Sequence, residues 1–312
     1  MAMNKYSLVI PVFKSEENLA DLFSSLEELS LLLNNQLEVV FVVDGSPDNS
    51  LKILLNQVPY FTYQSQIIEL SRNFGSFQAI RTGIEASNGD FIAVCSADMQ
   101  EPLDLVVSFF NSLEADECDI ALGTRRSRSD GWLNNASSNL FWKVYKRYIM
   151  KDVPNGGVDV FACNLNFRLH LLALKETRSS LIAQIFWLGF RRKFVEYDRA
   201  KRIVGKSSWS RKKKIDYMLD SIYSFTDLPI RLVTITGAIG SIGAILIGLL
   251  ILLLRLLNYI AVPGYTPILL AVLFLGALNL FAIGIIGTYI WRTFENSKGR
   301  PLSIIARKHS SE

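Results

Sequence analysis

The sequence predicts an α/β protein with a mostly parallel, Rossmann-like sheet, followed by interfacial helices and two transmembrane helices. Short apolar runs alternate with amphipathic stretches through residues 7–123, and two of these runs are followed by an aspartate within three residues. Farther along, residues 228–294 contain no acidic side chain and only three arginines. The first pattern indicates a sheet covered by helices, and the second indicates a membrane hairpin.

The elements of the sheet domain follow from this alternation, taken in chain order. The expected strands span residues 7–13, 38–43, 67–70, 90–95 and 119–123. The expected helices span residues 17–33, 50–57, 75–87 and 102–114. Strands that alternate with helices in this way indicate a parallel, doubly wound sheet with helices on both faces.

Carboxylates follow two of the expected strands. Asp44 comes after the strand at 38–43, and Asp98 follows the strand at 90–95. In doubly wound sheets, ligands bind beyond the carboxyl ends of the strands, so both side chains are expected at one crevice. The alternative for either residue is a turn or helix-capping role, which is common for aspartate.

Two uncharged runs near the C-terminal end are each long enough to cross a hydrocarbon core of roughly 30 Å. They span residues 232–254 and 267–291, and the loop between them carries only Arg255. Basic residues flank the pair on both outer sides, which places both termini and the domain in the cytoplasm, at a cell inner membrane. Residues 1–14 hold one short apolar run that reads better as a strand than as a signal peptide.

Four segments follow from these boundaries. Residues 1–210 are the expected globular domain, 211–230 a juxtamembrane amphipathic helix, 231–292 the hairpin and 293–312 a cytoplasmic tail. Residues 135–150 also show apolar side chains at helical spacing. Both amphipathic segments are interpreted as interfacial helices that attract anionic head groups, with packing on the domain core as the alternative.

Composition excludes several kinds of chemistry. The three cysteines (Cys95, Cys118 and Cys163) lack paired or metal-ligand spacing and are expected to be buried free thiols. The two histidines lie in the tail and in an apolar stretch, and neither a P-loop nor a nucleophile elbow occurs. A net charge of +4 does not indicate nucleic-acid binding. What remains is carboxylates and arginines, a set suited to holding phosphates.

Seven sequence blocks carry a family resemblance. They are SLVIPVFKSEENL, FVVDGSPDNS, LSRNFGSFQAIRTGI, NGDFIAVCSADMQEP, GTRRSR, GGVDVF and RAKRIVGKSSW, in this order, before the two spans. This ordered set resembles the family-2, GT-A-fold glycosyltransferases that act on polyprenyl phosphates, such as dolichyl-phosphate mannose synthases and bactoprenol glucosyltransferases. The resemblance implies inverting transfer of one sugar from a nucleotide-diphosphate sugar to a lipid phosphate such as undecaprenyl phosphate.

The resemblance also implies roles for individual residues. Asp98 is implied to reach a divalent ion, Mg²⁺ or Mn²⁺, and the donor diphosphate; Asp159 is implied to lie near the reacting carbon. The implied donor-binding residues are Pro11, Glu16, Asp44, Arg72, Asn73, Gly75, Gln100, Arg199, Arg202 and Lys206. Two positions depart from the family pattern, since Val43 and Ser96 each stand where many members have aspartate. The loss at position 96 predicts a weaker protein grip on the ion.

The acceptor sets further expectations. A phosphate monoester has a second pKa of about 6 and is largely a dianion at neutral pH. It needs no strong base, so Asp159 is either a base or an orienting group. Arg125 and Arg128 are interpreted as the lipid-phosphate site because guanidinium forks suit phosphate. The alternatives are a solvated basic loop there and an interfacial lysine at Lys206.

Two rival functions remain. One is a processive polysaccharide synthase, although the QxxRW pattern of such enzymes is absent. The other is a non-enzymatic, nucleotide-sensing membrane scaffold. The sequence does not identify the sugar; a UDP-hexose such as UDP-glucose is the favoured donor, with guanosine as the other base. Glycines along both spans permit close packing within the hairpin or between subunits, and a homo-oligomer is expected.

Overall fold

The computed structural model describes residues 5–126, 154, 158, 160–176, 179–199, 219–257 and 265–310. The chain divides into two compact units. One contains Met1–Ile215 together with Arg300–Glu312, and the other contains Asp216–Gly299. Each unit is described by itself.

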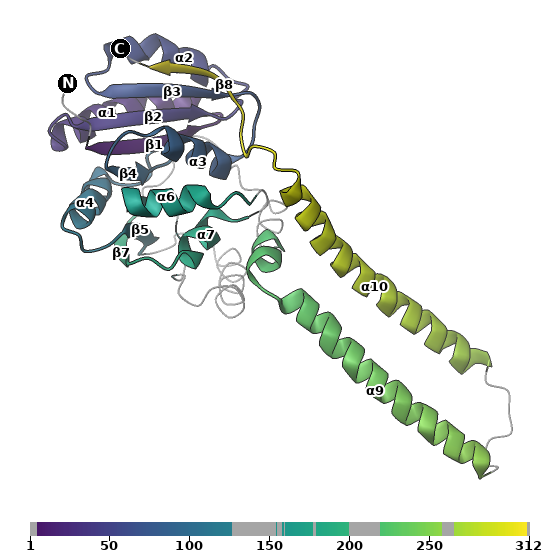
Figure 1. Cartoon of the computed structure of the whole chain (residues 1–312). Helices are drawn as coiled ribbons and strands as arrows, with labels where there is room; N and C mark the ends of the chain where they lie inside the picture. Colours follow the sequence, from purple (N-terminus) through teal and green to yellow (C-terminus); the bar gives the residue numbers. More distant parts are fainter. Residues whose placement is uncertain are drawn as a thin grey trace. The chain divides into compact units, whose positions relative to one another are not determined.

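The first unit is built on a sheet of eight strands in the order β7-β5-β6-β4-β1-β2-β3-β8 (Figure 1). Six strands run parallel to one another, whereas β6 and β8 run antiparallel to their neighbours. The strands are β1 (Tyr6–Val12), β2 (Leu37–Val43), β3 (Gln64–Leu70), β4 (Phe91–Val94), β5 (Ile120–Arg125), β6 (Phe161–Asn164), β7 (Arg192–Tyr197) and β8 (Ile305–Ser310). The expectation of an α/β fold with a mostly parallel sheet is therefore confirmed.

The central strands are apolar along almost their whole length because helices cover both of their faces. Every residue of β2 is buried. On one face, Leu8 and Phe41 belong to the main core, together with side chains of three helices. These helices are α1 (Leu19–Leu32), α2 (Ser50–Gln57) and α4 (Leu103–Glu114). A short 3-10 helix, η1 (Glu16–Asn18), precedes α1, and another, η2 (Val58–Tyr60), follows α2.

Helix α3 (Ser76–Ala86) packs on the opposite face of the sheet. Gly83 permits this close approach, because a Cβ there would lie 2.3 Å from Cγ1 of Val9 and 3.0 Å from Cγ2 of Val42. Two shorter helices follow β6 in the chain, α6 (Leu165–Ala173) and α7 (Leu181–Trp187). Arg81 of α3 ties them together: its guanidinium donates to Gln184 Oε1 at 3.0 Å and to the carbonyl of Leu174.

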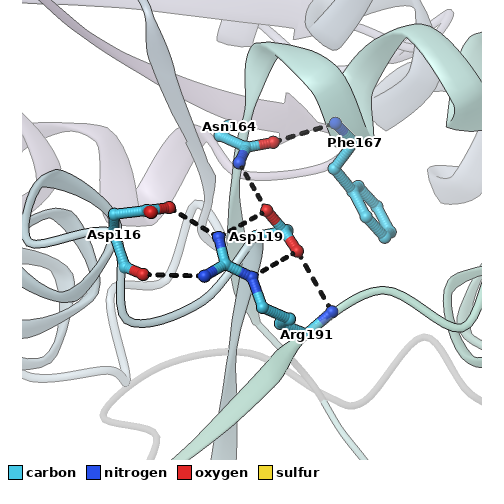
Figure 2. Close-up of polar contacts among 5 residues, drawn as sticks. All are labelled: Asp116, Asp119, Asn164, Phe167 and Arg191. Atoms are coloured by element: carbon cyan, nitrogen blue, oxygen red, sulfur yellow. Dashed lines mark hydrogen bonds and ion pairs between the residues drawn. The ribbon is translucent and has the colours of Figure 1, made fainter.

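A polar cluster joins several elements at the amino ends of the parallel strands (Figure 2). Arg191 donates through Nε and Nη2 to the two carboxylate oxygens of Asp119, each at 3.1 Å, and through Nη2 to Asp116 at 2.5 Å. Asn164 donates to Asp119 at 3.0 Å and accepts from the backbone of Phe167, which caps α6. The hydrogen bond from Arg191 is the largest effect on Asp119 and holds the pKa of its carboxyl below the usual value.

A second polar cluster at the same edge surrounds the buried carboxylate of Glu38. It accepts from Ser7 Oγ at 2.6 Å, Gln66 Nε2 at 2.6 Å, Asn88 N at 2.8 Å and Asn88 Nδ2 at 2.7 Å. Four donors satisfy this buried charge, as a buried carboxylate requires. Both clusters lie at the edge opposite the strand ends where a ligand is expected, so we assign them a structural role.

The second unit contains helices α9 (Leu228–Leu256) and α10 (Tyr265–Ser297). Each is long and apolar enough to cross a membrane, judged by length and composition, and most of its described side chains are exposed. Residues 219–225 are helical, and they meet α10 where Tyr223 contacts Tyr289 with ring centroids 5.4 Å apart. Arg292 also pairs with Asp220. Residues 135–150 and 211–218, part of the expected interfacial helices, lie outside the described residues.

The residues after α10 add a strand to the sheet of the first unit. Strand β8 pairs there antiparallel with β3 (Figure 1). The sequence pattern does not predict this strand.

All three cysteines are buried free thiols, as expected, and burial raises the pKa of each one.

Candidate functional site

The described candidate residues gather at the carboxyl ends of the parallel strands. Asp44 directly follows β2, Arg72 follows β3, Asp98 follows β4 and Arg199 follows β7, while Arg125 is the last residue of β5. Pro11 lies near the end of β1, and Glu16 begins η1. Strand β1 separates β2 from β4, so Asp44 and Asp98 follow strands about 10 Å apart.

Asp44 anchors the loop between β3 and α3. Its carboxylate accepts from the backbone N–H of Phe74 at 2.7 Å and of Gly75 at 2.9 Å. The side-chain amide of Asn73 donates to the Asp44 carbonyl at 3.1 Å. Burial is the largest effect on this carboxyl and raises its pKa, although the two N–H groups and Arg72 act in the opposite direction. At 2% exposure, Asp44 therefore holds residues 71–75 in place.

Gly45 makes the close contact between these two segments possible. Its φ is +56°, and a Cβ there would lie 2.4 Å from the backbone nitrogen of Asn73. Any other residue would force the loop away from β2. Within the loop, the Arg72 guanidinium lies 4.0 Å from the ring centroid of Phe74, a cation–π contact. The loop thus carries the positively charged guanidinium of Arg72 at the edge of the sheet.

A second network joins the loops that follow β1 and β2. Glu16 accepts from the backbone N–H of Asn49 at 2.9 Å and also from its side-chain amide. In return, the N–H of Glu16 donates to Asp48 at 3.2 Å. Asp48 also accepts from the hydroxyls of Ser46 at 2.5 Å and Ser50 at 2.9 Å. These hydrogen bonds hold the pKa of Asp48 below its usual value despite burial.

The segment after β4 brings together two carboxylates and a hydroxyl. Ser96 Oγ lies 2.5 Å from Asp98 Oδ1 and 2.7 Å from Glu101 Oε2. A serine hydroxyl has one hydrogen and donates it to one acceptor at a time. The hydroxyl therefore lies between the two carboxylates and draws them together. This concentration of hard oxygen atoms is the part of the site that suits a divalent ion.

Glu101 connects this segment to the end of β7. Its side chain is 1% exposed, and Oε1 lies 3.9 Å from Arg199 Nε. The neighbouring Gln100 is also buried. Arg199 thus offers a partner for this buried carboxylate. The donor-site candidates Gln100 and Arg199 are thus brought to the same place as Asp98.

Several candidates lie outside the described residues: Arg128, Asp159, Arg202 and Lys206. Within the described part of the chain, no group of three or more His, Cys, Asp or Glu side chains is arranged to hold a metal ion.

Sequence reasoning missed two residues of these networks. Asp48 lies in a polar stretch, SPDNS, and reads as an ordinary turn residue. Glu101 precedes Pro102 and reads as the flank of a helix. The one available signal was spacing, because Glu101 lies three residues after Asp98, close enough to share the same turn.

Comparison with known proteins assigns the family. The sequence pattern of glycosyl transferase family 2 matches residues 7–173, which are more than half of the chain. The chain therefore belongs to glycosyl transferase family 2 and is a glycosyltransferase. The family expected from the sequence blocks is confirmed.

Individual relatives align with almost the whole chain. An uncharacterized glycosyltransferase of Synechocystis sp. is 32% identical, over 96% of this chain and 94% of its own length. A prophage bactoprenol glucosyl transferase homolog of Escherichia coli is 29% identical, over 97% and 99%. The bactoprenol glucosyl transferase of Shigella phage SfV is 29% identical, over 96% and 98%. A solved structure, mannosyltransferase PcManGT from Pyrobaculum calidifontis, is similar with a TM-score of 0.49 and 13% identity, covering 93% of this chain and 88% of its own.

Proposed function

We propose that this glycosyltransferase moves a single sugar from a nucleotide-diphosphate sugar to a polyprenyl phosphate, with inversion, at the cytoplasmic face of a membrane. One observation carries the proposal. The E. coli relative named as a bactoprenol glucosyl transferase homolog aligns with 97% of this chain. An alignment of that extent includes both the sheet domain and the two long apolar helices, and therefore the parts that meet a soluble donor and a lipid acceptor.

The donor site comprises the loops after β1, β2 and β3. Arg72 contributes a fixed positive charge, and Asn73 and Gly75 belong to the loop that Asp44 holds. Glu16 acts through Asn49, on which its carboxylate is already engaged. Pro11 lies near the end of β1 and pairs in register with Val42 of β2. UDP-glucose is the proposed donor, with a guanosine nucleotide as the alternative.

The diphosphate end of the donor is assigned to the segment after β4. Asp98 and the diphosphate oxygens would together hold Mg²⁺ or Mn²⁺, which supplies positive charge where the bond to phosphate breaks. Gln100, Arg199, Arg202 and Lys206 complete this side of the proposed site. Because Ser96 stands where many family members have an aspartate, much of the ion's coordination would come from the nucleotide.

The acceptor phosphate attacks the anomeric carbon, and the nucleotide diphosphate leaves with the bonding electrons. The phosphate is largely a dianion at neutral pH, so no protein group has to remove a proton. Two anions must approach each other, which makes cations the main requirement. Arg125 and Arg128 are proposed to bind the lipid phosphate. Asp159 is proposed to orient the sugar or to stabilise positive charge on its ring, with a base as the alternative role.

The connectivity of the chain supports the proposed membrane topology. The sheet unit contains the chain up to Ile215 and again from Arg300, on either side of the unit that holds α9 and α10. Two spans between them bring the chain back to the side on which it started. With basic residues on both outer flanks, that side is the cytoplasm. The proposed segments remain residues 1–210, 211–230, 231–292 and 293–312, with β8 inside the last of them.

A second copy of the chain is a further proposed partner. A Cβ added at Gly237, Gly240, Gly243, Gly276, Gly284 or Gly287 would meet no atom within 4 Å. These positions therefore leave room for another helix to approach. Chemical crosslinking in native membranes should capture a dimer or higher species, and a monomer only would contradict the proposal.

One experiment tests the function. Purified protein in nanodiscs containing undecaprenyl phosphate is incubated with labelled UDP-glucose, other UDP-sugars and GDP-mannose, each with Mg²⁺ and with EDTA. The proposal expects one labelled glycolipid, formed from a single preferred donor and lost with EDTA. A long polymer would indicate a processive synthase, and nucleotide binding without any glycolipid would indicate a sensor.

A further inference from the structure

We propose that Ser303 and Ile304, which lie beyond the second apolar helix, are positioning residues of the donor site. They hold both flanks of the loop at residues 71–75, which carries Arg72, without touching the donor themselves. The donor part of this inference rests on the proposed function.

The first contact extends the sheet into the loop. β8 pairs with β3 from Gln66↔Ser310 to Leu70↔Ile305, with an irregularity between Glu69 and Leu70. Beyond the last pair, the N–H of Ser71 donates to the carbonyl of Ile304 at 2.9 Å. Ser71 is the first residue of the loop, so the C-terminal segment fixes the loop where it leaves the sheet.

The second contact fixes the other flank. Ser303 Oγ and Thr82 Oγ1 lie 2.6 Å apart. Thr82 belongs to α3, is 4% exposed and donates its own hydroxyl hydrogen to the carbonyl of Gln78 at 2.8 Å. Because a hydroxyl has one hydrogen to give, Ser303 is the donor in this pair. The C-terminal segment thus holds the helix that the loop enters.

The middle of the loop is held from elsewhere, by the Asp44 carboxylate on the N–H groups of Phe74 and Gly75. Three attachments therefore define a loop of a few residues: Ile304 before it, Asp44 within it and Ser303 after it. Gly75, with φ of +100°, adopts a backbone conformation open to glycine, where the loop enters α3. Without the C-terminal segment, Asp44 would be the one of these three residues that still holds the loop.

Only a short segment connects the second apolar helix to the residues that hold the loop. Helix α10 ends at Ser297, and only residues 298–302 separate it from Ser303. The exit from the second apolar helix is thus covalently tied, through a short segment, to the loop with Arg72. The residues after α10 form part of the donor-site scaffold.

Hydrogen–deuterium exchange on the full-length protein in nanodiscs tests the inference, with truncation after Leu302 as the main variant. The amides of Ser71, Phe74 and Gly75 should exchange at least tenfold faster than in the wild type, which corresponds to about 1.4 kcal/mol. Binding of UDP or GDP, whichever the wild type binds by calorimetry, should weaken roughly tenfold. A peptide of residues 300–312 added in trans should restore both, because strands can be added to a sheet edge.

Two variants make the test robust. Ser303→Ala keeps the strand and removes one hydrogen bond, so it should speed Ser71 exchange by about fivefold, or about 1 kcal/mol. The double substitution Arg307→Ala and Lys308→Ala changes two exposed charges but leaves the backbone pairing, and should have no effect. Wild-type exchange at Ser71–Gly75 in Ser303→Ala, or in a folded truncated protein, would overturn the inference.

The two proposals fail in different ways. Exchange is measured without any donor, so a wild type that transfers no sugar and binds no nucleotide would remove the proposed function and the donor part of the inference, while the exchange data would still decide whether Ser303 and Ile304 hold the loop. Accelerated exchange with unchanged nucleotide affinity would overturn the donor-site part of the inference while leaving glycosyl transfer intact.

Discussion

Replacing Asp44 with Asn tests whether this residue holds the donor loop. Asn is nearly isosteric but keeps only one acceptor oxygen, so one of the N–H groups of Phe74 and Gly75 would face an amide donor. A hydrogen bond to a charged group contributes about 1.5–3 kcal/mol, and the site is 2% exposed, so water does not compensate. We expect the free energy of unfolding of the sheet unit to fall by about 2 kcal/mol.

The expected loss of stability also sets an upper limit on how much nucleotide affinity falls. About 2 kcal/mol corresponds to roughly 30-fold in the equilibrium between the held and the displaced loop, which is an upper limit on the loss of nucleotide affinity. Urea unfolding followed by intrinsic fluorescence and nucleotide binding by calorimetry measure the two effects. Asp90→Asn, at an exposed site, is the matched control and should stay within about 0.5 kcal/mol of the wild type. Stability and affinity like those of the control would refute the anchoring role.

Three further predictions concern the other carboxylates. Asp98→Ala should abolish sugar transfer, and turnover near that of the wild type would remove Asp98 from the site. Glu101→Gln should lower kcat by about tenfold or more, and the loss in the double variant with Arg199→Gln should be smaller than the two single losses combined because the side chains are paired; additive losses would contradict this pairing. Hydrogen bonds from Arg191 hold the pKa of Asp119 below its ordinary value of 3.8, so its stabilisation is present above that pH and is lost as pH falls through the folded value. Urea unfolding between about pH 5 and 2.5 should therefore show a steeper loss of stability in the wild type than in Asp119→Asn, and equal slopes would contradict the assignment.

The central part of the fold could be predicted because its strands are unambiguous. Runs such as that of β2 are apolar on both faces, which only a covered parallel strand explains. The strand ends then locate Asp44 and Asp98 without further information. The role of Asp44 was less accessible, because whether a carboxylate faces a ligand or a neighbouring loop depends on residues 30 positions away.

Other elements carry no clear local signal. β8 has the sequence IARKHS, with three basic side chains, and becomes a strand because β3 offers an open edge to pair with. β6 is only four residues long and antiparallel to both of its neighbours, so alternation with helices does not reveal it. Glu101 is likewise recognised only when its contacts with Ser96 and Arg199 are seen. In each case tertiary contacts decide, as is common for short strands and buried polar groups.

The mass of the lipid product tests the central claim most directly. Wild-type protein in nanodiscs with undecaprenyl phosphate and its preferred nucleotide sugar should form a lipid heavier than the acceptor by one sugar residue, with a single phosphate and the anomeric configuration inverted relative to the donor. A product with two phosphates, with several sugars, or with the configuration of the donor retained would contradict the proposed transfer.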